Sequence, residues 1–87
     1  MTNRTELQER ANAASADLLL IDTEMALTLL DLANTTRSPE NRLRRRKEAR
    51  KAYFTILRLM PKVGMAAHQK TALEQRLNAL RRGLAKT

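Results

Sequence analysis

The segment SPENRLRRRKEARKAYFTILRLMP, residues 38–61, has a marked beginning and a marked end for one helix. Ser38 is a favoured N-cap residue, and Pro39 suits the first helical turn because its missing amide hydrogen is not needed there. Pro61 lacks the amide hydrogen that a continuing helix requires. The segment therefore predicts a helix over residues 39–60.

The apolar positions of this helix cover well over half of its circumference, and Ala49, Tyr53 and Leu57 are among them. A helix that is apolar on two sides needs a neighbour on each side to bury both. We therefore expect this helix to be the middle one of its bundle.

Two further helices are predicted, over residues 16–34 and over residues 66–85. The first has apolar residues at helical spacing, and the last has a narrower, seam-like line that includes Leu77. The apolar stripe of the first helix consists of Leu18, Ile21, Met25, Leu29 and Leu32, widened by Leu19, Ala26, Leu30 and Ala33. Short connections then give an all-α, antiparallel three-helix bundle.

The 87 residues are enough for one small domain, for which we expect residues 16–87. Residues 1–15 are either an N-terminal tail or an extension of the first helix, because the apolar spacing continues backward through Ala14, Ala11 and Leu7. Such an extension would overhang the bundle and offer a surface for a weak homodimer.

The net charge of +8 is unevenly distributed along the chain. Residues 1–36 contain six acidic and two basic residues, whereas residues 37–87 contain three acidic and fifteen basic ones. A basic half indicates acidic partners, such as nucleic acid or an anionic surface. The alternative is that an acidic helix packs beside a basic one, which neutralises part of the charge within the fold.

The arginine-rich stretch divides into two sets by helical angle. Arg42, Arg45 and Arg46 share the side of Ala49, where their guanidinium groups are expected to lie beside helix ends and cap carbonyl groups. The second set faces outward, is available to a partner or to phosphate groups, and consists of Arg44, Lys47, Lys51 and Arg58.

Asp22 falls within the predicted apolar arc of the first helix. An unpaired carboxylate would be costly there, so we expect it to pair with a basic residue or with the Tyr53 hydroxyl. A role in ligand binding is the alternative.

The residue sets that catalysis requires are missing from the sequence. The chain has no cysteine, its only histidine is His68, and its two glycines form no phosphate-binding loop. We expect no enzyme activity, no cofactor, no metal and no small-molecule substrate. No apolar run approaches the ~20 residues of a membrane span, so we expect a cytoplasmic protein without a membrane partner.

The segment EARKAYFTILRLMP resembles the second helix of a tetratricopeptide repeat. Ala49, Tyr53 and Pro61 occupy the small, aromatic and closing-proline positions, and the last predicted helix resembles the capping helix of such an array. The Trp-Leu-Gly-Tyr pattern of the family's first helix is missing, and only one hairpin is present. A bundle similar to a microtubule-interacting-and-transport domain is the structural alternative.

The tetratricopeptide resemblance implies a non-enzymatic protein-interaction module whose partner is another protein or a second copy of the chain. The alternative function is general binding of nucleic acid or an anionic surface through the outward basic residues.

Overall fold

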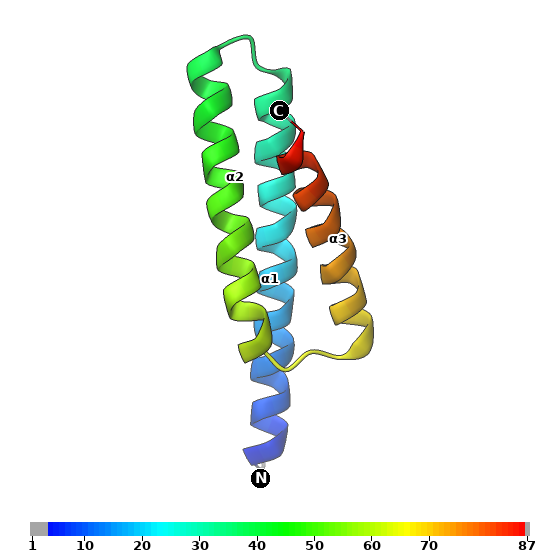
Figure 1. Cartoon of the computed structure of the whole chain (residues 1–87). Helices are drawn as coiled ribbons and strands as arrows, with labels where there is room; N and C mark the ends of the chain where they lie inside the picture. Colours follow the sequence, from blue (N-terminus) through cyan, green and yellow to red (C-terminus); the bar gives the residue numbers. More distant parts are fainter. Residues whose placement is uncertain (1–3, 87) are drawn as a thin grey trace.

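The computed structural model describes residues 4–86, which form an antiparallel bundle of three α-helices (Figure 1). These are α1 (Arg4–Thr35), α2 (Pro39–Leu59) and α3 (Ala67–Ala85), with a short 3-10 helix, η1 (Met60–Lys62), after α2. The molecule is a rod of 56 × 19 × 18 Å.

Helix α2 begins and ends close to the predicted positions. The hydroxyl of Ser38 accepts a hydrogen bond from the amide of Asn41 at 3.3 Å, and Pro39 is the first helical residue. The α-helix ends at Leu59 and tightens into η1, which contains Pro61.

Helix α1 is longer than the helix predicted over residues 16–34. It already includes Arg4, the first described residue. Residues 5–11 are exposed, and this part of α1 projects beyond the loop that joins α2 to α3 (Figure 1). Residues 5–11 thus form about two turns of overhang at the start of a continuous helix.

The prediction that α2 is the middle helix was wrong, because α1 occupies that place. Helices α2 and α3 lie on either side of α1 and contact each other less than either contacts α1 (Figure 1). The side of α1 that faces them is lined mainly by small or medium residues, which allow two helices to approach it closely. These buried residues are Ala16, Leu19, Thr23, Ala26, Leu30 and Ala33.

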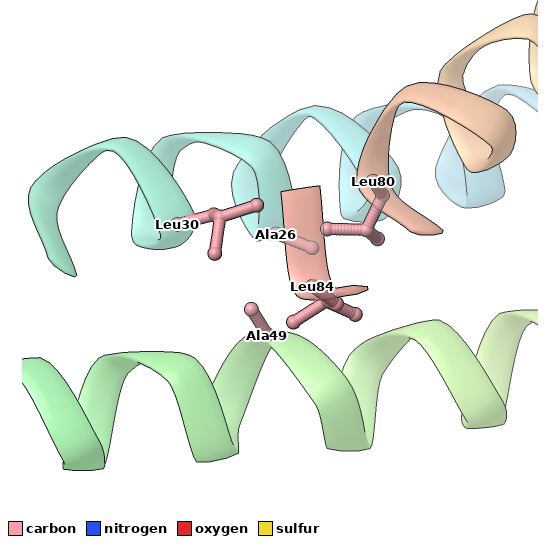
Figure 2. Packing of buried hydrophobic residues seen from close by; sticks show 5 residues of the cluster. All are labelled: Ala26, Leu30, Ala49, Leu80 and Leu84. Atoms are coloured by element: carbon pink, nitrogen blue, oxygen red, sulfur yellow. The ribbon is translucent and has the colours of Figure 1, made fainter. Parts of the chain in front are cut away.

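The core consists of two clusters along the rod. In the first, Ala49 of α2 faces Leu84 of α3 and Leu30 of α1 (Figure 2). The second contains Leu19, Ile56, Leu73 and Leu77. The side chain of Tyr53 packs against both clusters, so it connects them.

Candidate interaction surface

Helix α1 carries a second apolar line that the bundle leaves uncovered. The line has eight positions, which follow one another in alternating steps of four and three residues. All eight are exposed, and Thr28 is the only polar residue among them. We call this line the α1 seam, and it consists of Leu7, Ala11, Ala14, Leu18, Ile21, Met25, Thr28 and Leu32. The side chains of Leu18 and Met25 are 59% and 60% exposed.

This exposure corrects the sequence-based assignment of the core stripe. Leu18, Ile21, Met25 and Leu32 were expected in the core but are exposed, and Leu29 is half-buried. The residues predicted to widen the stripe, Leu19, Ala26, Leu30 and Ala33, are the ones that α1 buries. The small residues of the buried line let α2 and α3 pack closely on adjacent faces of α1, which leaves the larger seam side chains facing water.

A groove of about 350 Å³ lies beside the seam, between α1 and α2. Its apolar wall is formed by Met25 and Leu29 from α1 and by Ala52 from α2. Asp22 and Lys51 also line it. The seam and the groove therefore form one continuous surface across α1 and α2.

An acidic row borders the seam on the side toward α3. The row consists of Asp17, Glu24 and Asp31, which recur every seven residues. Glu24 forms an ion pair with Arg76 of α3 at 2.9 Å, and Asp17 accepts a hydrogen bond from Gln69 of α3 at 3.3 Å. Asp31 forms no ion pair with any residue in the described range 4–86 and is exposed.

A basic row lies on the other side of the groove, on α2. It consists of Arg44, Lys51 and Arg58, which are exposed and also recur every seven residues. Lys47, the fourth member of the predicted outward set, is exposed as well. None of these four side chains forms an ion pair within residues 4–86, although Arg44 donates a hydrogen bond to the Asn41 side chain at 2.9 Å.

Two of the three inward arginines, Arg42 and Arg46, behave as helix-end groups, whereas Arg45 forms an ion pair with Glu48 of its own helix at 3.7 Å. Arg46 donates hydrogen bonds to the carbonyl oxygens of Leu84, at 2.9 Å, and of Lys86, so it holds the end of α3 against α2. Arg42 donates to the carbonyl oxygen of Thr36 at 3.3 Å, immediately after the end of α1. These contacts use the two side chains within the monomer, whereas the outward set makes no such contact with a helix end within residues 4–86.

The expectation for Asp22 was wrong. The side chain is exposed, and within residues 4–86 it forms neither a hydrogen bond nor an ion pair. The buried line of α1 lies to one side of Asp22. The carboxylate therefore stays in contact with water, and its charge needs no partner in the fold. The Tyr53 ring instead makes an edge-to-face contact with Phe54, with the ring centroids 5.3 Å apart.

Leu77 is buried in the second cluster and Ala49 in the first, whereas Pro61 is exposed and His68 lies exposed in the first turn of α3. Within the described range, no group of three or more His, Cys, Asp or Glu residues is arranged to hold a metal ion. Nor does any helix of that range have the length and apolar character needed to cross a membrane.

Comparisons with models of protein families, with curated proteins and with solved structures give no match.

Proposed function

We propose that this protein is a non-enzymatic helical interaction or assembly module that binds its partner through the α1 seam and the adjoining groove. The seam extends about 38 Å at 1.5 Å per residue. A continuous exposed apolar surface of this kind is uncommon on a monomer and usually marks an interaction site. The observation that carries the proposal is the exposure of all eight seam positions.

The hairpin of α1 and α2 also supports a tetratricopeptide-like character for the module. Ala49 is fully buried against α1, and Tyr53 lies between the two core clusters. These are the roles that the small and the aromatic positions have in that repeat. In this proposal one hairpin and α3 form the scaffold, and the uncovered side of α1 forms the binding face.

The test compares three tagged proteins expressed in the same cells: the wild type, a Leu18→Glu/Met25→Glu variant and a Leu43→Glu control. Leu43 is 72% exposed and lies on α2, outside the seam and the groove. We expect the proteins that co-purify with the wild type to be retained by the control and lost from the seam variant. Retention by both variants would contradict a role of the seam.

A second function is supported by the outward basic set, whose members Arg44, Lys47, Lys51 and Arg58 form no ion pair with any residue of the described range 4–86. This arrangement would contact phosphates of DNA or RNA without reading the base sequence. The test measures binding to arbitrary duplexes as salt is raised. Reversing these charges should weaken binding and reduce its salt dependence, and an absence of binding at low salt would remove this function.

A further inference from the structure

We infer that the occupant of the α1 seam is a second copy of this chain, bound with the two α1 helices parallel and in register. This inference rests on the proposed function and names its partner. The alternation of four- and three-residue steps is the a/d pattern of a two-stranded coiled coil, and it is sustained for more than three heptads. Such a pattern matches a helix of the same repeat.

The overhang of α1 adds an argument for an intermolecular partner. Leu7, Ala11 and Ala14 continue the seam into the part of α1 where residues 5–11 are exposed. In Figure 1 this end of α1 projects past the other two helices, so neither of them can cover it. A second α1 helix covers the overhang and the rest of the seam with one straight contact.

The two charged rows select the relative orientation of the copies. The acidic row lies on one side of the seam and the basic row on the other. When two copies meet face to face about a two-fold axis parallel to the helices, the acidic row of each faces the basic row of the other. An antiparallel pair would place acidic beside acidic and basic beside basic, and such juxtapositions suppress association.

The acidic row and the basic row also place their residues at the same heights along the rod. Leu19 of α1 shares a core cluster with Ile56 of α2. Ala26, which is seven residues after Leu19, shares the other cluster with Ala49, which is seven residues before Ile56. The same antiparallel register places three acid–base pairs at equal heights, namely Asp17 with Arg58, Glu24 with Lys51, and Asp31 with Arg44. The parallel dimer joins each of these pairs between the two copies.

Two charged groups reduce this complementarity. Asp22 lies on the groove side of the seam, near the acidic row of the opposite copy, and Glu48 also lines the groove. Lys51 lines the same groove and offsets them. Glu24 keeps its ion pair with Arg76 within its own copy, so the contact between Asp31 and Arg44 is the cleanest pair to test.

The chain contains no cysteine, so single cysteines report contacts between copies without background. Leu7→Cys and Leu32→Cys occupy opposite ends of the seam. A parallel, in-register dimer brings each position against itself, within the Cα separation of about 7 Å that a disulfide tolerates. We expect both variants to form disulfide-linked dimers under mild oxidation, and we expect none from a Leu43→Cys control.

An antiparallel pair can bring only one level of α1 against itself. Self-linking of at most one of the two seam variants, or preferential linking of Leu7→Cys to Leu32→Cys in a mixture, would overturn the parallel arrangement. Linking of the Leu43→Cys control to the same extent would show that the disulfides arise from random collision, which also overturns the inference.

A charge-reversal experiment tests the same arrangement with intact seam residues. Asp31→Lys and Arg44→Glu each place two like-charge contacts in a homodimer, and each should weaken dimerisation roughly tenfold. A mixture of the two variants restores opposite charges at both contacts, so dimers should reappear at the wild-type concentration. The matched control is Glu74→Lys, an exposed reversal on α3 that should leave dimerisation unchanged.

Failure of the mixture to recover would overturn the inference, because a change confined to monomer stability is not repaired by mixing. A wild-type chain that stays monomeric at every concentration would overturn it as well. The proposed function fails separately, when the co-purifying proteins do not depend on the seam, so the two ideas can be distinguished.

Discussion

Leu77 and Leu18 are both leucines, but the first is buried and the second is exposed. Leu77 is 4% exposed in a core cluster that all three helices build, whereas Leu18 is 59% exposed on the seam. Leu77→Ala should reduce the free energy of unfolding by ~2–4 kcal/mol, because it leaves a cavity in the core. Leu18→Ala should change it by less than about 0.5 kcal/mol in dilute protein.

Chemical denaturation of the two alanine variants measures this difference. Equal losses would mean that the seam is packed within the monomer or that α3 is not docked at Leu77.

Arg46 and Arg44 differ in what their guanidinium groups contact. Arg46 binds two carbonyl oxygens at the end of α3, whereas Arg44 binds only the side chain of nearby Asn41. Arg46→Gln should therefore destabilise the fold by about 1 kcal/mol, since it removes charge-assisted hydrogen bonds that join α2 to α3. Arg44→Gln should cost less than about 0.5 kcal/mol. Thermal melts of both variants measure this difference. Equal shifts in melting temperature would refute the division of the arginines by helical angle.

The contact between α3 and α1 depends on the absence of a side chain at Gly83. A Cβ at this position would overlap the Cδ2 methyl of buried Leu30. Gly83→Ala should therefore destabilise the protein by roughly 1 kcal/mol, because overpacking outweighs the better helix propensity of alanine. A stabilised variant would show that Leu30 rotates away without cost.

Gly64, in the connection after α2, provides the matched control. A Cβ there meets only the side chain of Asn12, which is partly exposed and can move. Gly64→Ala should be neutral or stabilise by up to about 1 kcal/mol, because alanine restricts the unfolded chain. Denaturant titration of the two glycine variants should give opposite or clearly different shifts.

The existence and order of the helices could be predicted from the sequence, because caps and prolines act locally. Ser38 and Pro61 set the ends of α2 almost where they were expected. The identity of the middle helix could not be predicted from the width of an apolar arc. Such an arc shows how much surface avoids water, but not whether the covering partner is in the same chain.

Helix α1 illustrates that limit. Its seam and its buried line follow the same alternation of three- and four-residue steps, and the larger apolar residues of the seam favoured it for the core. The line that is buried instead depends on Ala16, Ala26 and Ala33, whose small size permits close approach of two helices. The missing signal was residue size, since small residues mark the side of a helix with the tightest neighbours.

At the scale of the whole molecule, an acidic α1 lies between two basic helices. The ion pair of Glu24 with Arg76 shows that part of the uneven charge is balanced inside the bundle. The basic row on α2 is not balanced in this way, because its members form no ion pair in the described structure. The uneven charge was visible in the sequence, but its division into balanced and available groups required the register of the helices.

In the proposed dimer, the α1 seam joins this protein to a second copy of itself. Sedimentation equilibrium over a wide range of concentrations tests it most directly, using the wild type, the Leu18→Glu/Met25→Glu variant and the Leu43→Glu control. We expect a reversible monomer–dimer equilibrium for the wild type and the control, and a monomer for the seam variant. A wild-type monomer at every concentration, or a seam variant that dimerises as strongly as the wild type, would contradict it.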